Sequence, residues 1–280
     1  MIKHLGVGKY AMGGMPFAMV PLPAERSTEK PRCKGLTMMM DWGLPVNQQR
    51  EWLDLVAPHV DLAKFVVGTA RLYDEDYLVE KINLYKTCSV HPFIGGQFLE
   101  YVYATQGLQG ARPFFLEAKR LGFDAIEVSD NVVSLDSNER QTLIRTAVDC
   151  GLEVHGEVGS KSENTGADTL IAQANECFEA GADVVLVEGA ELLTDGEPNR
   201  SVISALRDGL DVNKVVFELI GPWIPGTHHC DVYALKKFYI EEFGPDVNIA
   251  NVMPDQVWET ETLRAGLSVT GPPDTATDSI

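Results

Sequence analysis

Short apolar runs recur along the chain, and three of them follow a helix-like stretch that closes on a glycine. These three segments are RLGFDAIEVSD (120–130), DCGLEVHGEVG (149–159) and EAGADVVLVEG (179–189). Gly122, Gly151 and Gly181 are expected to end their helices in the left-handed conformation, and the β-branched run after each glycine predicts a buried strand. The same apolar signal recurs in GLTMMMD (35–41), VDLAKFVVGT (60–69), CSVHPFIGG (88–96), NKVVFELIG (213–221) and DVNIANVM (246–253). The pattern therefore predicts eight strands.

Helical periodicity fills the gaps between the predicted strands. In NQQREWLDLVAPHV (47–60), the apolar side chains expected on one face are Trp52, Leu53, Leu55 and Val56. In LDSNERQTLIRTAVDCG (135–151), Asp136 is expected to cap a helix, and Glu139 is expected to complete a capping box. The buried stripe of that helix is expected to consist of Leu143, Ile144, Ala147 and Val148.

Alternating strand and helix units of this number are typical of the (β/α)8 barrel, or TIM barrel, with a doubly wound open sheet as the alternative. We expect a single barrel domain over residues 35–268. Residues 1–34 precede the first strand and are expected to cover the bottom of the barrel or to pack on a neighbouring molecule. The end of the chain, 269–280, is rich in Pro, Thr and Asp and is expected to be a flexible tail.

The charge balance narrows the classes of partner. The 280 residues include 41 acidic and 23 basic side chains, a formal net charge of −18, which opposes binding to nucleic acid or to an anionic membrane surface. No apolar stretch reaches the roughly 20 residues that cross a bilayer, and the N-terminal residues lack the pattern of a signal peptide, so we expect a cytoplasmic protein. Widely spaced cysteines favour reduced, buried thiols over disulfides or a zinc site: Cys33, Cys88, Cys150, Cys177 and Cys230.

Polar side chains stand at the carboxyl ends of the predicted strands, where barrel enzymes carry their chemistry. These residues are Asp41, Lys64, Thr69, Gly95, Gly96, Gln97, Glu127, Ser129, Asp130, His155, Glu157, Lys161, Glu188, Glu218, Asn248 and Asn251. A single acidic residue at such a position is commonly a helix cap, but charges inside apolar runs are costly unless they face one another or an ion. The sequence therefore predicts a ring of carboxylates around one or two lysines at the barrel mouth.

Oxygen ligands on rigid strands suit Mg²⁺, which usually also holds an oxygen of a phosphate or an enolate. A lysine among carboxylates serves as a general acid or binds an anion, so Lys161 and Lys64 are candidates for catalysis or for a structural ion pair. The adjacent His228 and His229 follow the seventh predicted strand and either bind a metal or an anion or are merely exposed. They leave open a metal-dependent hydrolase with His and carboxylate ligands.

The series of strand-end motifs resembles that of the phosphosulfolactate synthase family. The matching motifs are GLTMMMDWGLP (35–45), KFVVGT (64–69), GGQFLE (95–100), LGFDAIEVSD (121–130), EVGSK (157–161), AGADVVLVEG (180–189), KVVFE (214–218), VNIANV (247–252) and ETLRAGL (261–267). They occur in the order and at the spacings of the family, from residue 34 to residue 268. Single motifs of this length are weakly specific, but nine in register are specific to the family.

The resemblance implies a (β/α)8 lyase that adds sulfite to phosphoenolpyruvate with Mg²⁺, in sulfonate metabolism that leads towards coenzyme M in some organisms. It implies a small anionic substrate, and because barrels of this kind commonly associate we expect a homo-oligomer. The residues expected to be catalytic are Asp41, Lys64, Glu157 and Lys161, with Lys161 as the acid that protonates C2. The expected metal ligands are Glu157, Glu188 and Glu218. The substrate is expected to contact Trp42, Gly96, Ser129, Asp130, His155, His228, His229, Asn251 and Arg264.

Four neutral residues stand where the family carries cationic side chains. They are Trp42, Ser160, Ala190 and Ser268. Phosphate and sulfite bind to cations or backbone N–H groups, whereas an indole favours a less phosphorylated, more apolar or cationic ligand. We therefore expect either the family reaction or a diverged lyase on a related enol or sulfonate. EKPRCKG (29–35) and NECFEAGAD (175–183) also resemble the plant heat-stress-associated branch, so a non-catalytic homologue is the alternative.

Overall fold

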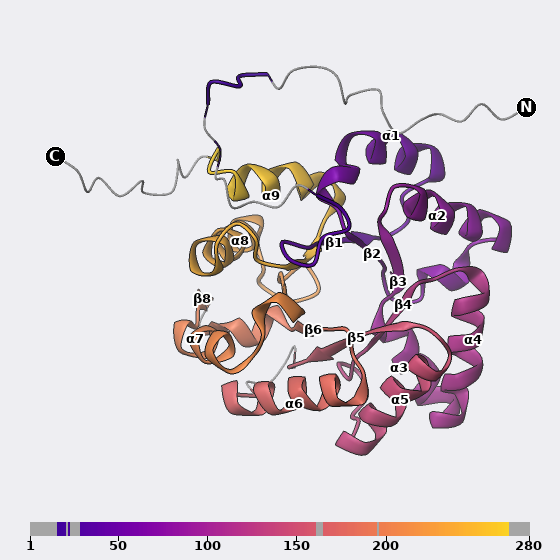
Figure 1. Cartoon of the computed structure of the whole chain (residues 1–280). Helices are drawn as coiled ribbons and strands as arrows, with labels where there is room; N and C mark the ends of the chain where they lie inside the picture. Colours follow the sequence, from indigo (N-terminus) through magenta and orange to yellow (C-terminus); the bar gives the residue numbers. More distant parts are fainter. Residues whose placement is uncertain (1–15, 21, 23–28, 161–164, 195, 269–280) are drawn as a thin grey trace, which may run out of the picture.

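The computed structural model describes residues 16–20, 22, 29–160, 165–194 and 196–268. Its centre is a closed barrel of eight parallel strands, which confirms the predicted (β/α)8 architecture and excludes an open sheet (Figure 1). The strands are β1 (Thr37–Asp41), β2 (Leu62–Phe65), β3 (His91–Ile94), β4 (Ala125–Val128), β5 (Glu153–Val158), β6 (Val184–Val187), β9 (Val215–Glu218) and β10 (Ile249–Val252). Strand β10 pairs with β1 and closes the ring. Each predicted apolar run contains one of these strands.

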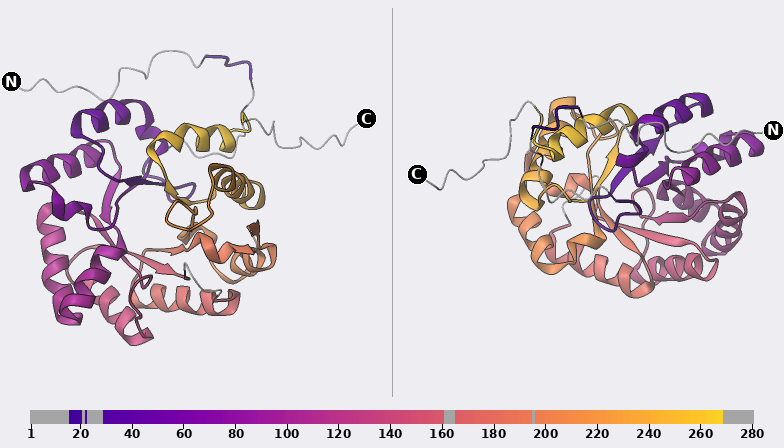
Figure 2. Two further views of the ribbon diagram at one scale, coloured as in Figure 1. Left: turned by 180° about the vertical axis from the view of Figure 1, so that it is seen from behind. Right: turned by 45° about the horizontal axis from the view of Figure 1, so that its top comes forward.

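Helices surround the barrel, as the view from behind in Figure 2 also shows. They are α1 (Val46–Val56), α2 (Glu75–Thr87), α3 (Gly96–Gln106), α4 (Ala111–Leu121), α5 (Ser137–Asp149), α6 (Ala167–Ala180), α7 (Arg200–Gly209), α8 (His229–Phe243) and α9 (Val257–Arg264). A short antiparallel hairpin follows β6 and consists of β7 (Leu193–Thr194) and β8 (Glu197–Pro198).

Apolar side chains pack in two layers. The barrel interior is filled by Met38, Leu62, Phe93, Ala125, Leu186, Val216 and Ala250. A larger cluster lies between the strands and the helices, where the Phe65 ring meets the rings of Tyr85 and Phe123 edge-on. Because side chains fill the middle of the barrel, it is a packed core and not a pore, and chemistry is confined to its rims.

The predicted helix ends are confirmed. The φ angle is 99° at Gly122, 79° at Gly151 and 111° at Gly181, which is the left-handed conformation that glycine adopts without strain. Asp136 accepts the Glu139 N–H at 2.8 Å, and Glu139 accepts the Asp136 N–H at 3.0 Å. This reciprocal capping box fixes the start of α5.

The predicted buried faces were wrong at two positions. Leu55 is 58% exposed and Val148 is 42% exposed. Helix α1 buries Leu53 and Val56, and a residue two places from Leu53 is turned by roughly 200° around the helix, so Leu55 faces outward. Val148 lies at the edge of the buried stripe of α5.

The last residues of the N-terminal extension cross the N-terminal rim of the barrel. Lys30 Nζ donates to the carbonyl oxygens of Ala57, at 2.8 Å, and Val60, at 2.5 Å. Arg32 Nε donates to Asp61 Oδ1 at 2.9 Å. This part of the extension therefore contacts the bottom of the barrel of its own chain.

The tail at 269–280 lies outside the described residues, so its predicted flexibility stays a prediction. Among the residues that the structure does describe, no helix has the length and apolar character needed to cross a membrane. The cysteines are free thiols, as expected, but only Cys177 is fully buried, and Cys33 and Cys230 are exposed.

Candidate active site

Three glutamates from separate strands converge at the C-terminal rim of the barrel. Glu127 comes from β4, Glu157 from β5 and Glu218 from the end of β9. An oxygen of each carboxylate lies within 4.8 Å of an oxygen of the other two, and all three side chains are buried. Like charges at this separation need a counter-charge.

Lys64, from β2, supplies a counter-charge. Its Nζ lies 2.8 Å from Glu127 Oε2 and 3.5 Å from Glu218 Oε1. Burial opposes the ammonium charge, but the carboxylates of Glu127, Glu218 and Glu157 outweigh burial and hold the pKa of Lys64 well above its ordinary value. Lys64 is therefore a fixed cation at neutral pH and a poor proton donor.

Lys64 contacts two of the three carboxylates directly. Burial raises the pKa of Glu127 to about 7, with Lys64 opposing the shift and Glu157 adding to it. Burial and Glu157 also raise the pKa of Glu218 well above its ordinary value. When all four of these described side chains are ionised, their charges sum to −2. A divalent cation that prefers oxygen ligands, such as Mg²⁺, fits this donor set.

The cluster lines a cavity of about 180 Å³. The other lining residues are Met40, Trp42, Val66, Val67, Gly95, Gly96, Gln97, Asn131, Trp223 and Asn251. Trp42, a predicted substrate contact, is 49% exposed, and with Trp223 it offers flat apolar surface. The N–H of Gly96, another predicted contact, donates to Glu127 Oε1 at 2.7 Å and so belongs to the support of the cluster.

Two asparagines at the cavity have fixed amide orientations. Asn131 Nδ2 donates to Glu157 Oε1 at 2.5 Å, and Asn251 Nδ2 donates to the Leu219 carbonyl at 3.3 Å. Both Oδ1 atoms are buried and have no hydrogen-bond partner within the described structure. Asn251 also has a φ of 62° within β10, which is uncommon for a residue other than glycine. Buried acceptors of this kind suit a ligand that donates hydrogen bonds or a cation.

Asn251 was predicted from its motif, whereas Asn131 was not. Asn131 lies in the loop after β4, three residues beyond the strand. A polar side chain so close to the end of a barrel strand is the signal that could have found it.

Asp41, a predicted catalytic residue, does not join the cluster. Its Oδ2 lies 2.8 Å from Lys81 Nζ and accepts the Tyr85 hydroxyl at 2.8 Å. Its Oδ1 accepts the N–H groups of Gly43, at 2.7 Å, and Leu44, at 2.9 Å. Both oxygens are engaged in a buried network that fixes the turn between β1 and α1, so the geometry gives Asp41 a structural position.

Arg264, a predicted substrate contact, lies at the opposite rim. Its guanidinium donates to the carbonyl oxygens of Pro245, at 2.5 Å, Val247, at 2.7 Å, and Leu36, at 3.3 Å. These carbonyls lie in the segments that lead into β10 and β1, near the N-terminal ends of the two strands. The side chain is 1% exposed and takes no part in the cavity at the C-terminal rim.

Three other predicted substrate contacts are not among the residues that line the cavity. The Ser129 hydroxyl donates to the buried carboxylate of Glu100, in α3, at 2.5 Å. Asp130 forms an ion pair with Arg140 at 2.5 Å. His155 lies in the barrel interior, where its ring meets that of Phe93 at 4.5 Å. Burial lowers the pKa of His155 to about 3, so the imidazole is neutral. None of the three predicted residues lines the cavity.

The group of candidate metal ligands contains Glu127 in place of the predicted Glu188. Glu188 is buried, and its Oε1 accepts the Ala190 N–H at 3.2 Å. The strand pattern placed both glutamates in the ring at the barrel mouth. The pattern could not show which of the two glutamates joins the group of candidate ligands. The relative heights of residues on different strands depend on the stagger of the closed barrel.

His228 and His229 stand at the start of α8 and are exposed. The His228 N–H donates to Asp231 Oδ2 at 2.7 Å, as part of the capping of the helix. Neither histidine lines the cavity, and the candidate ligand group found in the described part of the chain consists of carboxylates. The arrangement gives no support to a hydrolase with histidine ligands.

Lys161 lies outside the described residues, so its role stays a prediction. The residues that flank 161–164 are both held by Glu191, in the helical turn η4 (Gly189–Leu192) after β6. Glu191 Oε1 accepts the Ser160 N–H at 2.9 Å, and Oε2 accepts the Thr165 N–H at 2.8 Å. One carboxylate, 1% exposed, thus anchors both flanks of this segment.

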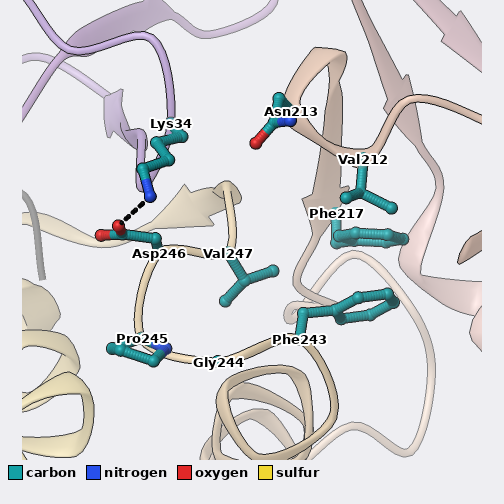
Figure 3. Close-up of a pocket in the computed structure, with 9 residues that line it drawn as sticks. All are labelled: Lys34, Val212, Asn213, Phe217, Phe243, Gly244, Pro245, Asp246 and Val247. Carbon is teal, nitrogen blue, oxygen red and sulfur yellow. Dashed lines mark ion pairs between the residues drawn. The ribbon is translucent and has the colours of Figure 1, made fainter. Parts of the chain in front are cut away.

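A second cavity, of about 350 Å³, lies near the N-terminal end of β10 (Figure 3). The Phe217 and Phe243 rings stack at 4.5 Å along one wall, and Lys34 pairs with Asp246 at 2.9 Å. Here an ion pair lies beside apolar side chains, whereas three carboxylates and a lysine converge at the cavity of the C-terminal rim. The C-terminal rim is therefore the candidate active site.

Comparison with known proteins identifies the relatives of this chain. The sequence model of (2R)-phospho-3-sulfolactate synthase (ComA) matches residues 25–270. The chain belongs to this family. The phosphosulfolactate synthase of Methanocaldococcus jannaschii is 34% identical over 245 residues, which cover 84% of this chain and 92% of the relative. The phosphosulfolactate synthase of Methanothermobacter thermautotrophicus is 29% identical over 249 residues, which cover 85% of this chain and 91% of the relative. Membership of this enzyme family confirms the resemblance seen in the motifs.

Other relatives are more distant. The Arabidopsis thaliana protein HEAT-STRESS-ASSOCIATED 32 is 23% identical over 268 residues, which cover 86% of this chain and 89% of the plant protein. Among solved structures, 3-hexulose-6-phosphate synthase from Salmonella typhimurium has a TM-score of 0.52 at 15% identity and covers 83% of this chain and all of its own. A putative phosphonomutase from Burkholderia cenocepacia has a TM-score of 0.51 at 14% identity, over 85% and 96%. At these identities the structures support the barrel fold alone.

Proposed function

We propose that this chain is a carbon–sulfur lyase of the phosphosulfolactate synthase type that adds sulfite to phosphoenolpyruvate. The observation that carries the proposal is the group of Glu127, Glu157 and Glu218 around Lys64, at the mouth of a barrel that belongs to this family. Carboxylates with perturbed pKa values in a cavity are typical of a site built for chemistry.

Mg²⁺ is the proposed cofactor, and Glu127, Glu157 and Glu218 are the residues that would hold it. The fit rests on three converging carboxylates, whose negatively charged oxygen donors suit a hard divalent cation. The buried Oδ1 of Asn251 adds a further oxygen to the same cavity. When bound, the ion supplies positive charge that stabilises the negative charge developing on the substrate carboxylate.

The proposed reaction adds sulfite across a carbon–carbon double bond. The sulfur lone pair forms the new bond to C3, the π electrons of the double bond move towards C2 and its carboxylate, and a proton is added at C2. Lys161 is the proposed donor of this proton. Lys64, which its carboxylate neighbours keep charged, is proposed to balance the charge of the site during the reaction.

A diverged lyase, acting on an enol carboxylate with less phosphate charge, is the second candidate. Among the described residues that line the cavity, Lys64 is the only cationic side chain, and carboxylates already surround it. Trp42 and Trp223 add apolar surface, which suits an apolar or cationic group better than a phosphate. The bond-forming step would be unchanged, and only the group recognised beside it would differ.

A non-catalytic role is the remaining alternative, and the likeness to the plant heat-stress protein is its support. The buried cluster argues against it, because a barrel that serves only as a scaffold gains nothing from three crowded carboxylates.

The test of the proposed function is to incubate the purified protein with phosphoenolpyruvate, sulfite and Mg²⁺ and to measure the sulfonated adduct by mass spectrometry. We expect adduct from the wild type and none from Lys161→Ala, with an unchanged circular dichroism spectrum. The control Lys237→Ala alters a surface lysine of α8 and should retain the wild-type rate. Absence of adduct from folded, metal-loaded wild type contradicts phosphoenolpyruvate as the substrate. Full activity of Lys161→Ala contradicts the assigned acid.

We propose in addition that the protein acts in the cytoplasm as a homo-oligomer and that its product enters sulfonate metabolism that leads towards coenzyme M. The free cysteines support a reducing compartment. Light scattering coupled to size-exclusion chromatography measures the oligomeric state, and a single monomeric species contradicts self-association.

A further inference from the structure

The first two turns of α3 support two of the three carboxylates of the cluster, one directly and one indirectly. The Gly96 N–H donates directly to Glu127. One turn later, Glu100 is 1% exposed and faces the loop after β4. Glu100 is not among the residues that line the cavity, so its role in the site is indirect.

Glu100 fixes the loop on both sides of Asn131. Its Oε1 accepts the Ser129 hydroxyl at 2.5 Å, and its Oε2 accepts the N–H groups of Val132, at 2.6 Å, and Val133, at 3.1 Å. Bonds to a charged acceptor are stronger than bonds between neutral groups. With residues 129, 132 and 133 held in this way, the position of the Asn131 backbone is determined.

Asn131 passes this constraint on to the cluster. Its Nδ2 donates to Glu157 Oε1 at 2.5 Å, which restricts the rotation of the Glu157 carboxylate. The same bond orients the amide, so that Oδ1 is the atom left buried without a hydrogen-bond partner in the described structure. Side chains that hold a metal ligand in this manner typically contribute about 10-fold to 100-fold to metal affinity.

We propose that Asn131 is a positioning residue, held by Glu100, which orients Glu157 for binding a divalent cation. The inference rests on the metal site of the proposed function but not on the identity of the substrate. It therefore predicts an effect on the binding of the metal alone.

The experiment is a titration with Mn²⁺, a paramagnetic substitute for Mg²⁺, in which electron paramagnetic resonance measures the free ion. Asn131→Leu keeps a similar volume without the amide and should weaken Mn²⁺ binding about 10-fold or more, with the melting temperature unchanged. The matched control is Asn138→Ala, at an exposed position in α5, which should bind as the wild type does.

Two variants of Glu100 test the indirect route. Glu100→Ala removes all three acceptor contacts and should weaken Mn²⁺ binding as Asn131→Leu does. Glu100→Gln should restore it, because the carbonyl oxygen can still accept from Val132 and Val133 while the NH₂ group donates to the Ser129 hydroxyl. Should Glu100→Ala fail to fold, Asn131→Leu alone still decides the outcome.

Wild-type affinity in Asn131→Leu overturns the inference, and so does a wild type that binds no Mn²⁺. Equal losses in Glu100→Gln and Glu100→Ala overturn the assignment of Glu100. A wild type that binds Mn²⁺ but forms no adduct contradicts the proposed reaction. In that case the Mn²⁺ affinity of Asn131→Leu still tests the role of Asn131.

Discussion

The Lys81 ammonium lies 2.8 Å from the Asp41 carboxylate, and neither side chain is exposed. Lys81 comes from α2 and Asp41 from the end of β1, so the pair joins a helix to the barrel rim. Lys81 also donates to Gln49 Oε1 at 3.1 Å and to the Leu44 carbonyl. Removing either partner of a buried ion pair destabilises the folded protein, because the other charge is left buried without a counter-charge.

Lys81→Met should destabilise the protein by about 3–5 kcal/mol, because it leaves a buried carboxylate without its counter-charge. Urea unfolding, followed by circular dichroism, measures this change. Arg50→Ala is the control: it breaks an ion pair with Glu80 whose side chains are about half exposed, and should change stability by no more than about 1 kcal/mol. If the two variants lose similar free energies of unfolding, the buried pair contributes no more to stability than the exposed pair does.

Glu127→Gln should weaken Mg²⁺ binding at least about 10-fold, because it removes a charge and an oxygen ligand from the cluster. Glu188→Gln, the same change at a buried strand-end glutamate outside the group, should have a clearly smaller effect. Isothermal titration calorimetry measures both affinities. The reverse order would restore Glu188 as the ligand and remove Glu127 from the site.

Metal affinity should rise with pH between about pH 6 and about pH 8. Burial raises the pKa of Glu127 to about 7, so protons compete with the cation for this carboxylate at neutral pH. Calorimetry in buffers of different ionisation enthalpy should detect protons released on binding. If the affinity does not depend on pH over this range, the carboxylates are already ionised in the metal-free protein, and the prediction is wrong.

The same carboxylate should affect the stability of the metal-free protein in the opposite sense. The folded-state pKa of Glu127, about 7, lies above its ordinary value of 4.5, so the folded protein binds more protons than the unfolded chain between these values. Stability from this group is therefore present at low pH and is lost as the pH rises towards 7. In Glu127→Gln this contribution should vanish, which a comparison of urea midpoints at several pH values measures.

Gly96→Ala should disturb the site, because an added Cβ would lie 2.1 Å from Ser129 Oγ and 3.1 Å from Glu127 Oε1. We expect a loss of about 1–3 kcal/mol in stability and weaker metal binding. Gly68→Ala is the matched control, since the nearest atom to its Cβ would be 3.8 Å away, in the Phe98 ring. Thermal unfolding and Mn²⁺ titration of the two variants test the expectation, and a harmless Gly96→Ala contradicts it.

The strands could be predicted because each is an apolar run closed by a polar residue, as in VVLVEG at 184–189. Barrel strands bury both faces, so the runs are continuous and easily seen. Within β5, His155 and Glu157 are two residues apart and therefore lie on the same face of the strand. The cluster at the rim followed from these two local rules.

The sequence could not show which distant groups a charged side chain meets. Arg264 was expected to contact the substrate because of its family motif, yet its partners are the carbonyls that precede β1 and β10. Asp41 stands at a strand end like the other candidates, but Lys81 occupies its carboxylate. Such partners are set by the closure and stagger of the barrel, which no local pattern encodes.

Glu191 holds the two residues that flank the 161–164 segment. Ser160 and Thr165 are both tied to this one carboxylate, which comes from the neighbouring βα unit and not from the strands that carry the metal cluster. The two ends of this segment are therefore held independently of what the three glutamates of the cluster bind. In evolutionary terms, the side chain at position 160 can change without loss of its tie, because the tie uses the backbone N–H and not the side chain.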